Sequence, residues 1–401
     1  MPNAMKTKQT QNGQRKSGKT MKKTLLILTV TTLTAAFGAT AFYLGTDKSQ
    51  VQATILTADL LQTEQVKIIE PADTTTKEKT TTKTIKADPF QVAVDEMTEM
   101  LNGTKPISFK RAVFLTENAY YGGKLSWTEF CNNIEQVKIK INQMIVSKNL
   151  QRFKTAGNWA IFTYMTDSIP ENNFHPYTYD LENFMGDKDY ESFMVSTLLK
   201  SKKGNCHSLP FLYKILADEV NVEAFIATAP MHVFIKHKDE QGKWWNLELT
   251  SGTFSRTSFI MESFYVSDAG MESGLYMKPL SDKESVALCL NDLLVYYDKK
   301  TGIYYDDFVY KTFTAGLKVY PNSLLQLSKV DYQKYKLDKA MEKKGLKDYS
   351  KIKPYPDLVK LEKELKTTKD YIAKIGYSSL TPEQYREKVM QIKNESTQAK
   401  N

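Results

Sequence analysis

KKGNCHSLPFLYKILADEVNVEAFIATAPMHVFIKHKDEQGKWWNLELTSG, from Lys202 to Gly252, is the stretch of sequence that decides the predicted fold. After a glycine–asparagine turn, apolar residues recur at helical spacing, which predicts a helix from about Cys206 to Val220. Two strand-like runs, EAFIATA and HVFIKHK, come next, and a polar turn at Asp239–Gly242 leads into a third run, KWWNLELT. The stretch therefore predicts a helix followed by an antiparallel hairpin, within an α+β fold.

Three side chains of this stretch belong to types that act together in covalent catalysis. Cys206 stands at the predicted start of the helix, where unpaired N–H groups and the positive end of the helix dipole favour a thiolate. His232 begins the second strand and Glu248 lies on the third. In a cysteine–histidine–acid triad the thiolate attacks a carbonyl carbon, the imidazole transfers the proton, and the acid orients the ring. The sequence therefore predicts a catalytic triad of these three residues.

Two further expectations concern the surroundings of the thiol. The Cys206 side chain is expected to open to a cleft rather than into the core. His207 follows it directly, but consecutive residues on a helix point about 100° apart. We therefore expect His207 to face solvent or to cap the helix.

Three short motifs make this stretch similar to a known family. They are K-G-x-C-x-S-L-x-x-L-Y at 203–213, P-x-H before an apolar strand at 230–232, and W-x-x-[VLI]-acid at 244–248. In this order and at this spacing they resemble the transglutaminase-like superfamily, which shares its core with papain-type cysteine proteases.

The resemblance implies a fold and a chemistry. It implies a papain/transglutaminase-like core, in which the helix bearing the cysteine packs on an antiparallel sheet, within a domain of residues 89–275 that has helical flanks. It assigns the nucleophile to Cys206, the base to His232 and the orienting acid to Glu248. The implied reaction is acyl transfer at an amide, and it needs neither a metal nor an organic cofactor.

The acidic motif departs from the usual pattern of the family. The family usually has aspartate, proline and threonine where this chain has Glu248, Leu249 and Thr250. Because glutamate is one methylene longer, its carboxylate must fold back or its strand must lie farther from the histidine. Asn246 lies on the same face of the strand and is the alternative orienter, so both assignments stay open.

The register of the hairpin decides whether either orienter faces His232. Directly opposed residues of an antiparallel hairpin have a constant sum of residue numbers and share a face of the sheet. Opposing His232 to Glu248 requires a sum of 480, which needs a loop with an odd number of residues, such as Asp239–Gln241 or Lys238–Gly242. A loop with an even number of residues gives 481 and turns both candidates to the other face. The triad therefore predicts an odd loop.

The rest of the folded chain is predicted to be helical. Residues 89–150 and 276–345 hold apolar residues at helical spacing. The motif F-x-x-G-L-x-x-Y-P at Phe313–Pro321 resembles the second helix of a tetratricopeptide repeat, although no second copy is visible. Residues 346–401 are predicted to be a charged helical tail, whose last helix begins with a capping box at Thr381–Gln384.

The N-terminal segment predicts export across the cytoplasmic membrane. Residues 25–45 are largely apolar and uncharged, directly after Lys22 and Lys23, so residues 1–45 are predicted to be a signal peptide or a single membrane anchor. Residues 46–88, rich in threonine and lysine, are predicted to be a disordered linker. The protein is thus expected to be secreted or periplasmic, or anchored by one transmembrane helix that is its only membrane contact.

Charge and cysteine content exclude other classes of protein. The net charge of +9 arises at the two ends, since residues 42–329 hold 31 basic and 35 acidic residues. A nucleic-acid-binding domain needs a basic stripe, which this acidic body lacks. The three cysteines have no C-x-x-C spacing, which argues against a disulfide framework and a structural zinc site.

Two functions remain open at this stage. The first is an exported cysteine hydrolase or acyltransferase that acts on a peptide or side-chain amide through the triad. The second is a catalytically weak or inactive module of the same fold that binds a protein or peptide, with the C-terminal helices as the interaction surface.

Overall fold

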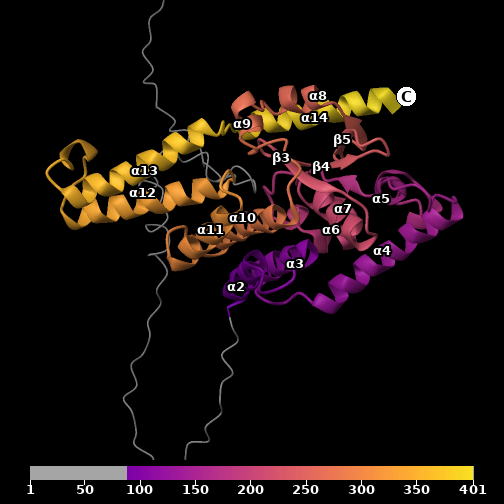
Figure 1. The fold of residues 1–401 in the computed structure, drawn as a ribbon, viewed down its shortest axis with the longest axis horizontal. Helices are drawn as coiled ribbons and strands as arrows, with labels where there is room; N and C mark the ends of the chain where they lie inside the picture. The colour runs from indigo at the N-terminus through magenta and orange to yellow at the C-terminus, as the bar shows by residue number, and fades with distance from the viewer. Residues whose placement is uncertain (1–87, 401) are drawn as a thin grey trace, which may run out of the picture. The chain divides into compact units, whose positions relative to one another are not determined.

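The computed structural model describes residues 88–400, with side chains as far as Ile392, so the predicted leader and all but the last residue of the predicted linker lie outside the described residues. Helices predominate, and together with one small antiparallel sheet they make the fold α+β (Figure 1). None of the helices within 88–400 combines the length and the apolar character needed to cross a membrane. The helices that precede the sheet are α2 (Pro89–Asn102), α3 (Phe109–Tyr120), α4 (Trp127–Ser147), α5 (Ala156–Thr166), α6 (Val195–Ser201) and α7 (Ser208–Glu219).

The sheet has four antiparallel strands in the order β3-β4-β5-β6. Their bounds are Phe225–Ala229 (β3), His232–Lys238 (β4), Trp244–Glu248 (β5) and Thr253–Ser255 (β6). Alternate residues face opposite sides, as the period of two requires. Val233 and Ile235 of β4 join the apolar core that contains α7, whereas Phe234 between them joins a separate apolar cluster on the other side. The sheet thus separates two cores.

A short parallel pair positions the start of α7. Strand β1 (Thr178–Tyr179) pairs with β2 (Lys203–Gly204), with Tyr179 opposite Gly204. The chain then turns through residues 205–207 into α7, which packs on β3 and β4. Cys206, two residues before α7, is therefore held beside the turn between β3 and β4, where its Sγ lies 3.8 Å from the carbonyl oxygen of Met231.

Two short helices and five longer ones follow β6 within the described residues. The short ones are α8 (Thr257–Ser263) and α9 (Asp268–Glu272), and the longer ones are α10 (Asp282–Thr301), α11 (Asp307–Val319), α12 (Leu325–Lys343), α13 (Pro356–Lys374) and α14 (Pro382–Lys400). Helix α10 packs against α2, α3 and α11, and it shares the core of α7. Helices α12 and α13 pair with each other over a small apolar cluster of their own.

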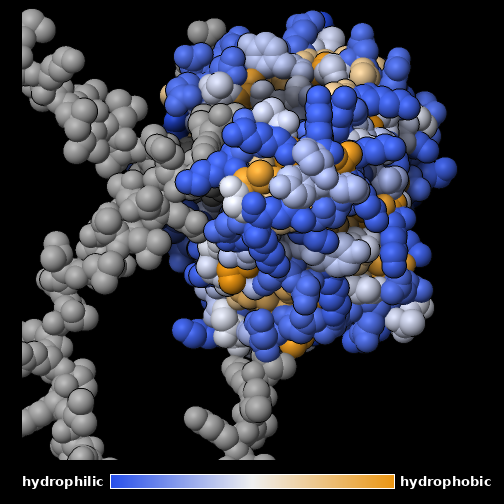
Figure 2. Space-filling view, turned by 90° about the vertical axis from the view of Figure 1, so that its left-hand side faces the viewer, coloured by the Kyte–Doolittle hydropathy of each residue, from blue (hydrophilic) through white to orange (hydrophobic). Residues whose placement is uncertain are grey.

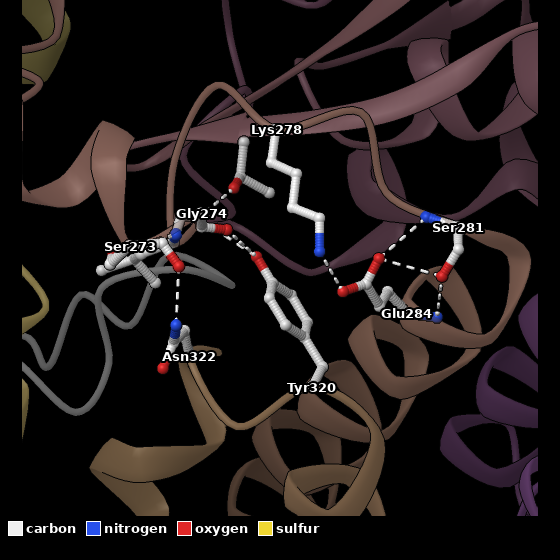
Figure 3. Close-up of polar contacts among 9 residues, drawn as sticks. Ser273, Gly274, Lys278, Ser281, Glu284, Tyr320 and Asn322 are labelled. Atoms are coloured by element: carbon white, nitrogen blue, oxygen red, sulfur yellow. Dashed lines mark hydrogen bonds and ion pairs between the residues drawn. The ribbon is translucent and has the colours of Figure 1, made fainter.

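The segment 273–281 joins the sheet side of the molecule to these helices (Figure 3). The Tyr320 hydroxyl donates to the carbonyl of Gly274 at 3.0 Å, and the Asn322 amide donates to the carbonyl of Ser273 at 2.6 Å. A capping box and a lysine–glutamate ion pair hold the other end of the segment at the start of α10. Both ends of the connection are therefore fixed by side-chain hydrogen bonds.

The second core lies on the face of the sheet opposite α7, and α14 closes it. Tyr385, Val389 and Ile392 of α14 recur at helical spacing and are buried there, together with Phe264 after α8. The predicted capping box starts this helix: the Thr381 N–H donates to the side chain of Gln384 and the Gln384 N–H donates back to the side chain of Thr381. The face of the protein shown in Figure 2 is mostly hydrophilic, with small separate hydrophobic spots where grey atoms do not cover it.

Candidate active site

Cys206 lies in the turn before α7, and this helix begins two residues later than the sequence predicted. The side-chain oxygen of Asn205 accepts hydrogen bonds from the N–H groups of His207 (2.9 Å) and Ser208 (3.2 Å), as a helix-capping asparagine does. The Asn205 carbonyl accepts from the N–H of Leu209 at 3.2 Å. The thiol therefore still stands at the N-terminal end of the helix.

The thiol is buried, so the prediction that it opens to a cleft is wrong. Cys206 is 3% exposed, and His232 and Glu248 are each 1% exposed. The cysteine does not lie under the leucine face of α7. It belongs to the second core, on the α14 side of the sheet. What closes the site is a helix from the far end of the chain, which no local pattern around Cys206 indicates.

His232 and Glu248 are in direct contact. The Nε2 atom of His232 lies 2.5 Å from Oε2 of Glu248. The other carboxylate oxygen, Oε1, accepts from the hydroxyl of Thr250 at 2.6 Å and from its N–H at 3.1 Å. Because three groups hold the carboxylate, the glutamate has one orientation, and it presents one oxygen to the imidazole.

The register that brings them together differs by two from the predicted one. Lys236 lies opposite Asn246, which is a sum of 482 rather than 480, and the loop between β4 and β5 has five residues, Asp239–Lys243. The Asp239 carboxylate accepts from the N–H of Lys243 at 2.8 Å and from the ring N–H of Trp245 at 2.9 Å, which closes the loop one residue later than expected. A shift of two keeps the same face of the strand, so the longer glutamate reaches His232 diagonally.

Asn246 does not contact the histidine. Its side-chain amide donates to the carbonyl of Ser255 at 3.1 Å and to the hydroxyl of Thr257 at 3.2 Å. These bonds tie β5 to the last residue of β6 and to the first residue of α8. Of the two orienters that the sequence left open, the structure brings only Glu248 to His232.

The second nitrogen of His232 is the distinctive feature of the site. Nδ1 is buried and has no hydrogen-bond partner among the described residues. Cys206 is close enough to the imidazole to raise its pKa. Burial lowers the pKa of His232, but the negative charges of Glu248 and Cys206 outweigh burial and raise the pKa to about 10. Phe264 stacks on the imidazole with ring centroids 4.1 Å apart and planes 9° apart, which fixes the plane of the ring.

The charge of the histidine acts back on its acid. Burial raises the pKa of Glu248, and the opposing influence of His232 and Thr250 holds the pKa below its ordinary value. At neutral pH the buried pair is therefore an imidazolium facing a carboxylate, with one N–H of the ring still available.

Two tyrosines that sequence analysis missed approach the sulfur. The Tyr385 hydroxyl of α14 donates to Sγ of Cys206 at 2.8 Å. The hydroxyl of Tyr179 in β1 is buried and has no hydrogen-bond partner among the described residues. Cys206 and Tyr385 are nevertheless close enough to influence its pKa. Burial raises the pKa of both tyrosines well above its ordinary value, so both hydroxyls are protonated donors. The helical spacing of the apolar residues of α14 was the one signal for Tyr385, because it predicts a face that needs a partner.

His207 is buried, so the expectation that it faces solvent is wrong; it occupies the N-cap position of α7, but its side chain makes no capping hydrogen bond. Its Nε2 lies 2.9 Å from Oδ2 of Asp292 in α10, and its Nδ1 lies 3.0 Å from the carbonyl oxygen of Phe193. The asparagine at 205 provides the cap instead. His207 connects the turn that carries Cys206 to the helical core.

No protein-family model, curated protein or solved structure matches the chain. Within residues 88–400, no cluster of three or more histidine, cysteine or acidic side chains has the arrangement of a metal site.

Proposed function

We propose that the chain is a transglutaminase-like cysteine hydrolase or acyltransferase, with Cys206 as nucleophile, His232 as acid and base, and Glu248 as orienter. The observation that carries the proposal is that the two ring nitrogens of His232 have different surroundings. Nε2 lies 2.5 Å from Glu248, whereas Nδ1 has no hydrogen-bond partner among the described residues, and Cys206 is close enough to the ring to raise its pKa. A cysteine in the turn that leads into a helix, with that helix packed on an antiparallel sheet, is also close to the core arrangement that the sequence resemblance implies.

The geometry supports a two-step acyl transfer. In the first step Sγ of Cys206 bonds to the carbonyl carbon of an amide, and His232 gives its Nδ1 proton to the nitrogen that leaves as an amine. The product of this step is a thioester on Cys206. In the second step water attacks the thioester carbon while His232 accepts one of its protons, and the C–S bond breaks, which gives a carboxylic acid and restores the Cys206 thiolate beside the imidazolium. An amine in place of water gives transfer instead of hydrolysis.

Glu248 and Tyr179 have supporting roles in this proposal. The Glu248 carboxylate keeps the imidazole in one orientation and stabilises its positive charge. The backbone N–H of Cys206 and the hydroxyl of Tyr179 are the donors that we assign to the oxygen on which negative charge develops. The proposed substrate is a protein or peptide outside the cytoplasm, in keeping with the predicted leader.

The second candidate function is that of a binding module without catalysis. The observation in its favour is that all three triad side chains are buried and that the Tyr385 hydroxyl donates a hydrogen bond to the sulfur of Cys206. In that case the same fold presents its C-terminal helices to a protein partner, and the triad has no turnover.

Alkylation of Cys206 across a range of pH separates the two candidates. The full chain is treated with a neutral thiol electrophile, and each cysteine is followed by peptide mass mapping. For an enzyme, an imidazolium beside the sulfur keeps Cys206 reactive at pH 6, and His232→Ala lowers that rate by about tenfold or more. An identical pH profile in the wild type and in His232→Ala would instead favour the binding module.

A further inference from the structure

Helix α14 covers the sulfur of the candidate nucleophile. The Tyr385 hydroxyl occupies one side of Sγ at 2.8 Å. The Tyr385 ring lies between two aromatic rings of the site, with centroids 6.1 Å from Phe184 and 6.2 Å from Phe264. Since Phe264 also stacks on His232, a single helix closes the approach to both the nucleophile and its base.

The cover docks through one narrow face. Among the side chains of α14 that the structure describes, which end at Ile392, the buried ones are Tyr385, Val389 and Ile392, which lie four and three residues apart and so form one stripe of the helix. Met390, on the outer face of the same turn, is 47% exposed. Besides the apolar stripe and the hydrogen bond from Tyr385 to the sulfur, α14 makes an ion pair of 2.8 Å between Arg386 and Asp187. Both of these side chains are more than a third exposed. A pair as exposed as this adds little to the docking of the helix.

The segment that leads into the cover is held much more firmly than the cover. The Ser273 hydroxyl donates to the carbonyl of Ile375 at 2.8 Å, and the Ser267 hydroxyl donates to the carbonyl of Gly376 at 2.9 Å. Gly376 has a φ of +74°, and a Cβ atom there would lie 2.1 Å from the backbone nitrogen of Gly270, so only glycine fits. Ser273 is itself held from the other side by Asn322 (Figure 3).

A second anchor lies just before α14 begins. The Tyr276 hydroxyl donates to the carbonyl of Ser378 at 2.8 Å, and the Ser378 hydroxyl donates to the carbonyl of Tyr265 at 3.1 Å. The described chain is therefore fixed up to residue 378, and α14 starts at Pro382. A helix on a fixed base that docks by one apolar stripe can open as a local unit without unfolding the rest.

We infer that α14 is a detachable autoinhibitory cover, which holds Cys206 closed through Tyr385 and must leave the second core before a substrate reaches the thiol. The inference rests on the proposed function only for what the thiol does once it is exposed. The closed structure is then the resting state, and a partner or substrate that binds the apolar stripe of α14 opens the site.

The three cysteines provide the test, because they lie in three different environments. Cys206 lies under the cover, Cys289 is fully buried in α10 within the first core, and Cys131 is partly exposed on α4. A small neutral thiol reagent is added to the full chain, and the rate at each cysteine is read by peptide mass mapping. Cys289 reports unfolding of the whole protein, and Cys131 reports the activity of the reagent.

The key variant is Val389→Asp, which places a charge in the buried stripe, and its matched control is Met390→Asp on the outer face of the same turn. We expect labelling of Cys206 to rise at least tenfold in Val389→Asp and to stay within twofold of the wild type in Met390→Asp, with Cys289 protected in both. Tyr385→Phe removes one hydroxyl and leaves the packing, so it should raise the rate about fivefold. If Val389→Asp also exposes Cys289, the fold has been lost and Tyr385→Phe decides the matter.

The inference is overturned if Cys206 is labelled at the same rate in the wild type, Val389→Asp and Tyr385→Phe while Cys289 stays protected. Its failure differs from that of the proposed function, because labelling by a neutral reagent requires access and no turnover. If Val389→Asp exposes Cys206 but the reactivity of the thiol does not depend on His232, the result supports α14 as a cover and contradicts the proposed enzyme. A protein in which Cys206 is labelled equally fast in the wild type, Val389→Asp and Tyr385→Phe, but more slowly in His232→Ala, would contradict the cover and support the enzyme.

Discussion

Two buried histidine–carboxylate pairs lie near Cys206, and they differ in what the second ring nitrogen contacts. In each pair Nε2 faces a carboxylate, at 2.9 Å for His207 and Asp292 and at 2.5 Å for His232 and Glu248. The Nδ1 atom of His207 lies 3.0 Å from a backbone carbonyl oxygen, whereas the Nδ1 atom of His232 is left without a partner among the described residues.

The comparison teaches that burial and an acid partner do not by themselves make a histidine catalytic. Both histidines have these properties, and His207 even adjoins Cys206, the proposed nucleophile, in the chain. A carbonyl oxygen only accepts, so the Nδ1 proton of His207 is committed to a structural bond. Only His232 keeps a proton-carrying nitrogen for chemistry, and we therefore assign structure to one pair and catalysis to the other.

Removing His232 is expected to have the largest effect. In His232→Ala the thiol loses its acid and base, so hydrolysis of a peptide amide should fall by about 10³-fold or more. Activity is measured on a background that opens the site, such as Tyr385→Phe, so that access is equal in both proteins. Hydrolysis within tenfold of that background would break the assignment of catalysis to this pair.

Removing His207 should affect stability instead. His207→Ala leaves the buried Asp292 carboxylate without its hydrogen bond to His207, while its Oδ1 already has no partner among the described residues, and breaking such a pair costs about 3 kcal/mol of the free energy of unfolding. Urea unfolding measures this loss, and the same preparation should retain hydrolysis per folded molecule at low temperature. A loss of turnover with unchanged stability would reverse the two roles.

Glu248→Gln should change the pH dependence of turnover. Glu248 and Cys206 outweigh burial and together raise the pKa of His232 to about 10, so the imidazolium that protonates the leaving amine persists in the wild type to that pH. The uncharged amide removes this support while burial remains, so the alkaline limb of activity should move toward neutral pH and the rate at pH 8 should fall about tenfold or more. Rates across pH 6–11 measure the shift, with Asn246→Ala as the control on the same strand.

The same pair should make stability depend on pH in a defined direction. The folded-state pKa of His232 is raised, so its contribution is fully present below the unfolded value of about 6.5 and is lost as pH rises through about 10. The folded-state pKa of Glu248 is lowered, so its contribution is present above the unfolded value and is lost as pH falls through the folded one. Urea midpoints at pH 7 and pH 10 should differ less in Glu248→Gln than in the wild type.

Asn246→Ala should have the smallest effect. It removes hydrogen bonds to Ser255 and Thr257 at one end of the sheet, which costs about 1 kcal/mol of stability. Because Asn246 does not touch the imidazole, turnover should stay within twofold. A catalytic loss as large as that of Glu248→Gln would mean that the amide, and not the carboxylate, orients His232 in the working state.

The sequence supported the prediction of what is local and failed where distant segments meet. Cys206, His232 and Glu248 fall in one stretch whose strand period already puts the acid on a definite face, so their meeting could be anticipated. The exact register could not, because the Asp239 side chain closes the hairpin loop one residue later than the turn residues indicate. Tyr385 was missed because a helix face shows that it needs a partner without showing which one.

His207 illustrates the same limit on a smaller scale. The sequence predicts that the His207 side chain points away from that of Cys206. It does not predict what surrounds His207, because Asp292 comes from α10, far along the chain. The helix start was placed two residues early because the side chain of Asn205, rather than the backbone pattern, sets where α7 begins. In both cases a side-chain hydrogen bond decides the outcome, and periodicity does not report it.

The most direct test of the central claim is a pH titration of the histidine rings by nuclear magnetic resonance. The chain has only four histidines, so each ring can be assigned by single substitution. We predict that His232 remains an imidazolium from pH 7 to pH 9, titrates at about 10, and titrates at lower pH in Glu248→Gln and in Cys206→Ser. A His232 ring that titrates near its ordinary pKa of about 6.5, and does not respond to either substitution, would contradict a catalytic pair at this site.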